Sequence, residues 1–253
     1  MQLLKNKTVF ITGGLSGIGK ACALLAAEEG ATIIIADLPS EMEAPAMQEI
    51  KNINSTAVFM SCNVANFTEV QNTIEKVVRD FGKLDIALNN AGIGGEAHAT
   101  GDMTEAAWAQ VIGVNLTGVF NCMRHELAQM AKQEHGIIVN MSSILGKVGF
   151  ASSCHYVAAK HGVLGLTQTA ALEYAEKNIR INAICPGFIA TPLLEKGGIH
   201  QHSDIEQHIM QMHPMKRFGT SEEIASAFLF LCTPQSSFMT GSALEMDGGF
   251  LAQ

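Results

Sequence analysis

Residues 8–19 read TVFITGGLSGIG, a β-branched run that passes directly into a glycine-rich turn. A helical segment follows, and a second apolar run at 32–36 ends at Asp37. Glycines allow a sharp strand-to-helix turn and a close approach of a ligand to the backbone, and the start of the helix attracts a pyrophosphate. An acid about 20 residues beyond such a turn binds the adenosine ribose hydroxyls. The stretch therefore predicts a dinucleotide-binding βαβ unit with contacts from Gly13, Ser16, Gly17, Ile18, Gly19, Asp37 and Leu38.

Short apolar runs alternate with longer helical periods along the rest of the chain. In the short runs, polar and apolar residues hardly alternate, as expected for strands buried on both faces. These runs lie at 8–11, 32–36, 56–60, 86–88, 137–141, 180–184 and 243–245. The clearest helix is predicted at 67–81, where Val70, Ile74 and Val77 share one face. We therefore predict an α/β fold, a Rossmann-type doubly wound parallel sheet of about seven strands with helices on both faces.

Length and composition narrow the class of protein. No linker or internal repeat divides the 253 residues, which predicts a single dinucleotide-binding and catalytic domain over 1–253, and the least regular segment, 191–218, is expected to form a small substrate lid. With 16 basic and 24 acidic residues the net charge is −8, which argues against nucleic-acid and anionic-membrane partners. Six scattered cysteines without a CxxC pair, and no visible targeting segment, favour a reduced cytoplasmic protein.

Tyr156 and Lys160 stand four positions apart in a segment of helical period, so they share one helix face. An ammonium beside a phenol favours the phenolate, and we expect the pKa of Tyr156 to lie below its reference value of about 10. A tyrosine of that kind is suited to acid–base work near neutral pH.

Six motifs in a fixed order resemble those of one known family. They are the 12–19 turn, Asn89-Asn90-Ala91-Gly92, Asn115, Ser142-Ser143, Tyr156-x-x-x-Lys160 and Pro186-Gly187. Their order over nearly the whole chain is similar to that of the short-chain dehydrogenases/reductases. The resemblance implies a catalytic set of Asn115, Ser143, Tyr156 and Lys160, and the family's serine spacing selects Ser143 over Ser142.

The resemblance implies a role for each member of this set. Tyr156 would exchange a proton with the substrate oxygen, and Ser143 would hydrogen-bond the same oxygen as charge develops there. Lys160 would hold the nicotinamide ribose hydroxyls and lower the pKa of the tyrosine. Asn115 would bind a water near Lys160 and complete a proton relay to solvent.

The resemblance also extends the cofactor site. It implies adenine contacts from Asn63 and Val64, ribose-side contacts from Asn89, Ala91 and Gly92, and nicotinamide contacts from Pro186, Gly187, Ile189 and Thr191, besides Tyr156 and Lys160. Asp37 would accept the adenosine ribose hydroxyls and repel a 2′-phosphate, for which neither Leu15 nor Leu38 supplies a guanidinium. NAD(H) is therefore the expected cofactor.

The resemblance also implies a substrate pocket over the nicotinamide, for which the candidate residues are Gly94, Glu96, Ile144, Leu145, Ser153, His155 and Phe188. The candidate loops are mostly apolar, which favours a ketone or secondary alcohol with hydrophobic substituents. Four histidines of the lid segment, His200, His202, His208 and His213, show no spacing typical of a zinc motif, so no metal is expected.

The sequence thus predicts an NADH-dependent oxidoreductase that interconverts a ketone and a secondary alcohol by hydride transfer, with the tyrosine as acid and base. A 3-oxoacyl-acyl-carrier-protein reductase, a polyol dehydrogenase and a hydroxysteroid dehydrogenase stay open as alternatives within the enzyme class. An NAD-binding sensor or scaffold could share the same fold. Relatives are commonly tetramers, which implies a homotetramer that pairs helices near 106–130 and 154–175 and the C-terminal segment.

Overall fold

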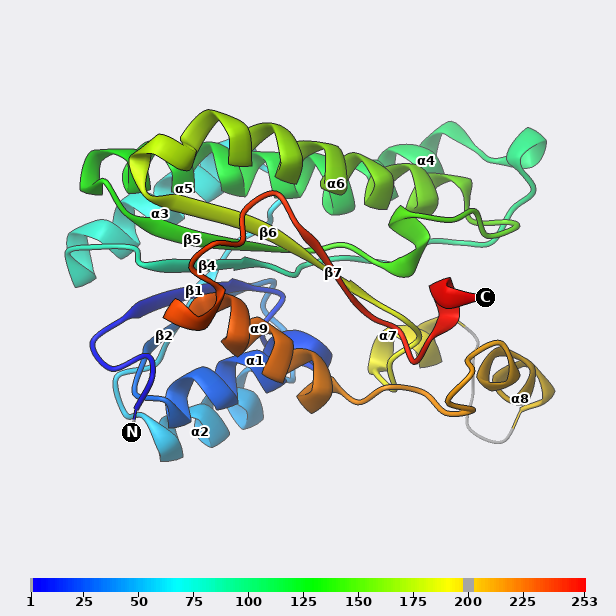
Figure 1. Ribbon diagram of the computed structural model, residues 1–253, viewed down its shortest axis with the longest axis horizontal. Helices are drawn as coiled ribbons and strands as arrows, with labels where there is room; N and C mark the ends of the chain where they lie inside the picture. The colour runs from blue at the N-terminus through cyan, green and yellow to red at the C-terminus, as the bar shows by residue number, and fades with distance from the viewer. Residues whose placement is uncertain (1, 198–202) are drawn as a thin grey trace.

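The computed structural model describes residues 2–197 and 203–253. Its centre is one parallel sheet of seven strands in the order β3-β2-β1-β4-β5-β6-β7 (Figure 1). The strands are β1 (Thr8–Thr12), β2 (Thr32–Asp37), β3 (Val58–Ser61), β4 (Ile86–Asn89), β5 (Gly136–Met141), β6 (Ile179–Pro186) and β7 (Ala243–Met246). The predicted doubly wound sheet is confirmed.

The predicted strand bounds agree with the structure within two residues because burial on both faces gives these runs their apolar character. β1, for example, is buried at all five positions. β3 begins two residues later than predicted, at Val58. Asn54 Oδ1 accepts hydrogen bonds from the Thr56 amide and hydroxyl at 3.0 and 2.6 Å, and this turn keeps Thr56 out of the strand.

Helices cover both faces of the sheet (Figure 1). One face carries α1 (Gly17–Glu28), α2 (Glu43–Ile53) and α9 (Ser221–Cys232), and the other carries α3 (Phe67–Phe81), α4 (Glu105–Ile112), α5 (Gly118–Gln133) and α6 (Cys154–Tyr174). Phe10 and Ile11, neighbours in β1, belong to the two separate cores, as the period of two along a strand requires.

α3 has the predicted bounds because its ends are well marked in the sequence. The Asn66 side chain accepts hydrogen bonds from the Thr68 and Glu69 amides at the start of the helix. Gly82 ends the helix in the left-handed conformation, with φ 78°. Val70, Ile74 and Val77 form the buried face between these ends, as predicted.

The order of the strands places a crevice beside β1. The chain winds outward from β1 through β2 to β3, and then crosses back so that β4 lies on the other side of β1. The loops after β1 and β4 therefore diverge at the carboxyl ends of the strands, which is where open α/β sheets bind their ligands. This position brings the residues after Thr12 and Asn89 to one edge of the sheet.

The segment at 191–218 contains two short helices, α7 (Pro192–Lys196) and α8 (Asp204–Gln211). Residues 198–202, which include the predicted lid histidines His200 and His202, lie outside the described residues. Between α4 and α5 the chain forms one π-helical turn, Gly113–Thr117. Within the two described ranges, no helix is long and apolar enough to cross a membrane.

Candidate active site

The glycine turn after β1 is held by the end of β4. Thr12 Oγ1 accepts the amides of Asn90 and Ala91 at 3.0 and 3.1 Å, and the Asn90 side chain donates to the carbonyl oxygens of Thr12 and Gly13 at 3.1 and 2.9 Å. A Cβ on Gly13 would lie 2.8 Å from Ala91 Cα, and one on Gly19 would lie 2.2 Å from the Gly13 oxygen. Only glycine permits this close packing, and the absence of side chains lets a ligand approach the protein backbone closely at this turn.

The second half of the turn touches the loop after β6. Ser16 caps α1 in an extended conformation, and Gly17 follows with φ +52°. A Cβ on Gly17 would lie 3.3 Å from Thr191 Cγ2, so the turn predicted to bind the pyrophosphate lies beside the loop predicted to bind the nicotinamide. Ile18 and Ile189 line the same cavity. The start of α1 and its free amides therefore lie beside the loop expected to hold the nicotinamide.

The adenosine end of the predicted site is formed by the ends of β2 and β3. Asp37 Oδ2 accepts the Leu15 amide at 3.2 Å, and Asp37 Oδ1 accepts the Leu38 amide at 2.8 Å. Asn63 Oδ1 accepts the Ala65 amide at 3.0 Å. Asp37 and Ser61 pair across β2 and β3, so both loops leave one edge of the sheet, and the carboxylate is fixed beside the glycine turn.

Asn89 is predicted to line the ribose side of the cofactor, but its side chain points into the core, where it donates to Glu126 Oε2 and Asn140 Oδ1 at 3.0 Å each. Burial raises the pKa of Glu126 to about 8, although the bond from Asn89 lowers it. Its neighbour Asn90 lines the cavity. The pleat of β4 sends adjacent side chains to opposite faces, so only one asparagine of the pair can face the crevice.

Asn115 lies in the π-helical turn and is fully buried. Its Oδ1 accepts the Ile93 amide and its Nδ2 donates to the Ile93 oxygen, both at 2.8 Å. Gly92 packs against the same amide, since a Cβ there would lie 3.4 Å from Asn115 Oδ1. Asn115 therefore braces the loop after β4 with both polar atoms, and its role in a water relay stays a prediction.

Ser143, Tyr156 and Lys160 meet on the wall of one cavity. Ser143 hydrogen-bonds Tyr156, and its Oγ also accepts the Leu145 amide at 3.1 Å. Lys160 Nζ donates to the Met141 oxygen at 2.7 Å and lies 5.5 Å from the centroid of the Tyr156 ring. Ser142 supports the group from outside, because its hydroxyl donates to the Lys160 oxygen at 3.0 Å.

The pKa of Tyr156 corrects the sequence expectation. Burial of the phenol raises its pKa to about 12, and the hydrogen bond with Ser143 offsets only part of this. Burial also lowers the pKa of Lys160 to about 8. The expected lowering of the tyrosine pKa fails because the ammonium bonds the Met141 oxygen and desolvation outweighs its charge. At neutral pH Tyr156 is a protonated phenol, which can donate its proton.

The loop after β6 is held by its backbone. The Gly187 amide donates to the Met246 oxygen at 3.0 Å, and the Ala190 amide donates to the Gly219 oxygen at 3.0 Å. Gly187 is also needed for space, because a Cβ there would lie 3.0 Å from Asp247 Cα. Of the predicted nicotinamide contacts, Pro186, Gly187, Ile189 and Thr191 all line the cavity that holds Tyr156.

That cavity has a volume of about 460 Å³. It contains every predicted substrate residue, namely Gly94, Glu96, Ile144, Leu145, Ser153, His155 and Phe188. Leu193, Leu194, Ile205 and Ile209 of α7 and α8 complete an apolar wall, and Phe150 lies opposite. Among its described lining residues, Lys160 is the single Lys or Arg. The cavity therefore suits an uncharged, largely apolar molecule.

His155 ties the loop after β4 to the catalytic helix. Its Nδ1 accepts the Tyr156 amide at 2.8 Å, and its Nε2 lies 3.1 Å from the Glu96 oxygen. Gly95 makes room for the ring, since a Cβ there would lie 2.6 Å from His155 Nε2. In the described part of the chain no three His, Cys, Asp or Glu side chains gather in a group that could hold a metal ion.

Comparison with known proteins agrees with this geometry. A family model described as enoyl-(acyl carrier protein) reductase matches residues 13–251. Cyclohexanol dehydrogenase of Acinetobacter sp. (strain SE19) is 40% identical over 248 residues, which cover 98% of this chain and 96% of that protein. The chain belongs to the short-chain dehydrogenase/reductase family. As such it is an oxidoreductase that acts on CH–OH groups and binds a nicotinamide cofactor.

Further members of the short-chain dehydrogenase/reductase family show the range of related activities. A 3-oxoacyl-(acyl-carrier-protein) reductase of Thermotoga maritima is 40% identical over 248 residues, which cover 98% of this chain and 99% of that protein. The crystal structure of levodione reductase superposes with a TM-score of 0.94 at 34% identity, covering 98% of this chain and 99% of that one. The crystal structure of NAD⁺-bound xylitol dehydrogenase superposes with a TM-score of 0.92 at 34% identity, covering 97% of this chain and 99% of that one. The names of these relatives refer to ketone or alcohol substrates.

Proposed function

We propose that the protein is an NAD(H)-dependent oxidoreductase that interconverts ketones and secondary alcohols with hydrophobic substituents. The observation that carries the proposal is the meeting of Ser143, Tyr156 and Lys160 on the wall of an apolar cavity beside the glycine turn. A proton donor, a hydrogen-bond donor for the same oxygen and a cation are what carbonyl reduction needs from the protein. A sensor or scaffold would have no need of the three together.

The residues fit a bound dinucleotide. The cradle formed by Gly13 and Gly19 would take the pyrophosphate, Asp37 the adenosine ribose, and Lys160 the nicotinamide ribose. Asp37 supports NAD(H) over NADP(H), because a carboxylate repels a 2′-phosphate and the nearby Lys20 pairs with Glu49 at 2.7 Å. When bound, the nicotinamide supplies or accepts the hydride.

The protein's own residues handle the proton. In ketone reduction, Tyr156 donates its phenolic proton to the substrate oxygen, and its raised pKa of about 12 keeps that proton in place until the oxygen becomes basic. Ser143 holds the same oxygen through its hydroxyl. Lys160 places its positive charge next to the tyrosine ring and stabilises the phenolate that forms.

The cavity supports an uncharged substrate over an acyl chain delivered by an acidic carrier protein. Carrier proteins need a basic surface at the mouth of the site. Here the rim residue Glu96 is acidic, and Lys147 pairs with Glu245. The apolar wall of Leu193 and Ile205 gives no partner for several substrate hydroxyls, which argues against a polyol. The named activity of the Acinetobacter relative on cyclohexanol is consistent with this choice.

A panel of carbonyl compounds tests the proposal. Cyclohexanone, a ketosteroid, a ketose and an acetoacetyl carrier protein are each offered with NADH and with NADPH, and cofactor oxidation is followed by absorbance. We expect turnover of the uncharged apolar ketones and a higher kcat/KM with NADH. Turnover confined to the carrier-protein substrate would overturn the substrate class, and a preference for NADPH would overturn the role of Asp37.

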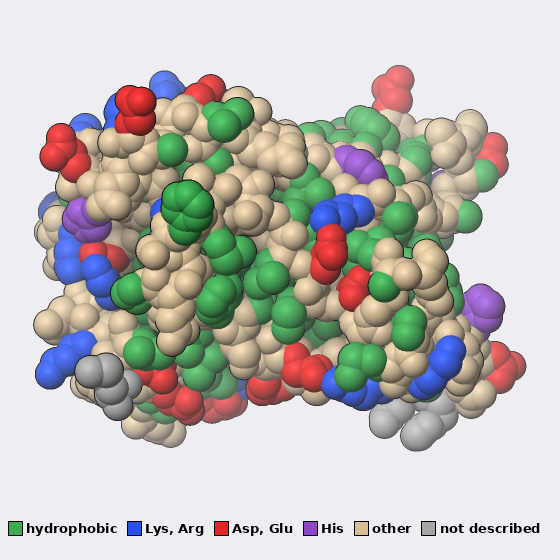
Figure 2. All heavy atoms as spheres, in the orientation of Figure 1, with side chains coloured by type: hydrophobic (Ala, Val, Ile, Leu, Met, Phe, Trp, Pro, Cys, Tyr) green, Lys and Arg blue, Asp and Glu red, His purple; other side chains and the backbone are tan. Residues whose placement is uncertain are grey.

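We also propose a homotetramer in a reducing, cytoplasmic setting. Trp108, Phe120 and Leu172 of the helix pair expected to form contacts are 42%, 46% and 85% exposed. β7 is an edge strand, and Figure 2 shows hydrophobic side chains on the face of the molecule that carries it, together with a small cluster of charged side chains right of centre. All six cysteines are free. Light scattering at micromolar concentration should give four times the monomer mass, and a monomer would refute the assembly.

A further inference from the structure

His213 is a buried histidine of the lid segment that lies between the end of α8 and the loop after β6, and the proposed mechanism does not use it. Its exposed fraction is 1%. Nδ1 lies 3.0 Å from the Ile209 oxygen at the end of α8, and the Phe188 amide donates to Nε2 at 3.3 Å. Nδ1 must carry the hydrogen and Nε2 the lone pair, so these two bonds select one neutral tautomer.

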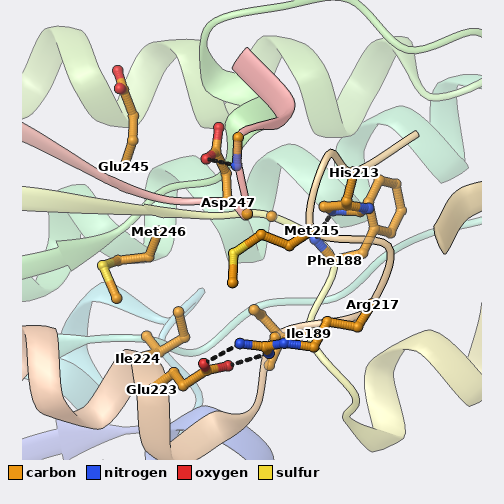
Figure 3. A pocket seen from close by; sticks show the side chains of 14 residues that line it. Phe188, Ile189, His213, Met215, Arg217, Glu223, Ile224, Glu245, Met246 and Asp247 are labelled. Carbon is orange, nitrogen blue, oxygen red and sulfur yellow. Dashed lines mark hydrogen bonds and ion pairs between the residues drawn. The ribbon is translucent and has the colours of Figure 1, made fainter. Parts of the chain in front are cut away.

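The imidazole fits its position closely. It packs edge-on against Phe188, with ring centroids 5.7 Å apart (Figure 3), and next to Phe250, with ring centroids 5.4 Å apart. Gly187 leaves room for it, because a Cβ there would lie 3.1 Å from His213 Nε2. A ring held by two hydrogen bonds and two aromatic neighbours has one orientation.

The two bonds of His213 reach two different walls of the catalytic cavity. Ile209 and Phe188 both line that cavity, and Ile189, next to Phe188, is a predicted nicotinamide contact. One bond therefore acts on the apolar wall over the substrate, and the other acts on the loop over the nicotinamide.

A second cavity explains why the loop needs this bond. It has a volume of about 310 Å³, and its lining includes Gly187, Phe188 and Ile189 of the loop together with Met215, Ile224 and Met246 (Figure 3). Phe188 packs against the rings of Phe150, Phe218 and Phe250, and Ile189 is 5% exposed, but the cavities on the two sides leave the loop space into which it could shift. Its position therefore depends on this packing together with its backbone hydrogen bonds, one of which ends on His213.

We propose that His213 is a positioning residue that sets the substrate wall and the nicotinamide loop through separate nitrogens. The proposal rests on the proposed function for its kinetic consequence, but not for its structural one. Through Nε2 it holds the loop, and through Nδ1 it holds the end of α8. Loss of the Nδ1 bond should therefore affect substrate binding, and loss of the Nε2 bond should affect cofactor binding.

Two conservative variants separate the bonds. His213→Asn places an amide nitrogen where Nδ1 stands and keeps the donation to Ile209, but it has no acceptor for the Phe188 amide. His213→Gln places an oxygen where Nε2 stands and keeps that acceptor, but it loses the donation to Ile209. His213→Phe keeps an aromatic ring and loses both bonds. His208→Asn, at an exposed histidine of α8, is the control.

Amide hydrogen exchange of the cofactor-free protein gives the structural readout. We expect exchange in peptides covering 187–191 to be about tenfold faster in His213→Asn and unchanged in His213→Gln. Exchange in peptides covering 204–211 should be faster in His213→Gln and unchanged in His213→Asn. In His213→Phe, exchange should be faster in both groups of peptides. His208→Asn should leave the 187–191 peptides unchanged. Equal exchange in the wild type and all three His213 variants would overturn the proposal.

Steady-state kinetics give the functional readout. We expect His213→Asn to raise KM for NADH about tenfold, and His213→Gln to raise KM for the ketone instead, each with a smaller change in kcat. A merely structural histidine would lower both variants' active fraction and leave both KM values unchanged, which contradicts the proposal. A wild type that turns over no ketone would sink the proposed function, whereas the exchange pattern would still decide the role of His213.

Discussion

Glu126 of α5 is a fully buried carboxyl group whose ionisation should make the fold sensitive to pH. It accepts one hydrogen bond, from Asn89, and no Lys, Arg or His is recorded as its partner among the described residues. Its Oε1 and the Asn89 Oδ1 have no hydrogen-bond partner in the described structure. Glu126→Gln removes the ionisable group and keeps an oxygen that can accept the Asn89 bond.

The expected magnitude follows from the raised pKa. Burial raises the pKa of Glu126 from 4.5 to about 8. Between these two values the unfolded chain has released the proton and the folded protein has kept it, so stability falls as pH rises. The loss is about 1.4 kcal/mol per pH unit and about 5 kcal/mol over the whole window, and it is absent below the lower value.

Urea unfolding of the wild type and Glu126→Gln, at one fixed protein concentration, measures this directly. Relative to the wild type, the variant should gain about 3 kcal/mol between about pH 5 and about pH 7. Glu28→Gln, at an exposed carboxylate of α1, is the control and should show no such trend. Parallel stability curves for wild type and Glu126→Gln would show that Glu126 is ionised in the fold and that our view of this site is wrong.

Three further predictions concern the active site. Burial lowers the pKa of Lys160 to about 8, so its positive charge is lost as pH rises through that value, and kcat/KM for NADH should fall above about pH 8. Lys160→Arg should move this fall in kcat/KM to higher pH, and a fall at the same pH in the variant would contradict the prediction. Asn90→Ala removes two bonds to the glycine turn and should weaken NADH binding about tenfold in a fluorescence titration, and unchanged binding would show that the turn holds itself. Gly95→Ala combines φ +75° with a methyl 2.6 Å from His155 Nε2, and should lower the free energy of unfolding in urea by about 1–3 kcal/mol, which an unchanged midpoint would disprove.

The fold was predictable because its signals are local and strong. Strands buried on both faces read as unbroken apolar runs, and α3 carries both a cap and a terminal glycine. Right-handed crossovers then place helices on both faces of the sheet. The bounds of β3 were less predictable, because the turn at Asn54 depends on side-chain bonds that propensity does not show.

The site was predictable where a motif identifies a residue, and less so where packing decides the orientation of a side chain or its pKa. Ser143, Tyr156 and Lys160 come together as expected. Which of Asn89 and Asn90 faces the crevice depends on the pleat at the end of β4, which the motif does not reveal. The direction of the Tyr156 pKa shift depends on how far burial exceeds the influence of the lysine, and this requires coordinates.

The lid segment shows a different limit. The spacing of its histidines predicts no metal site, and nothing in that spacing distinguishes His213 from the rest. The role that we propose for His213 depends on Phe188 and Ile209, which are distant from each other in sequence and lie at its two nitrogens.

The most direct test of the central claim compares the wild type with Tyr156→Phe in the NADH-dependent reduction of cyclohexanone. NADH affinity is measured in parallel by fluorescence. We predict that the wild type turns over, and that the variant keeps its NADH affinity within about threefold while kcat falls at least about a hundredfold, because the proton donor is gone. Equal kcat values in the two proteins would contradict the assignment of Tyr156 as the acid of the reaction.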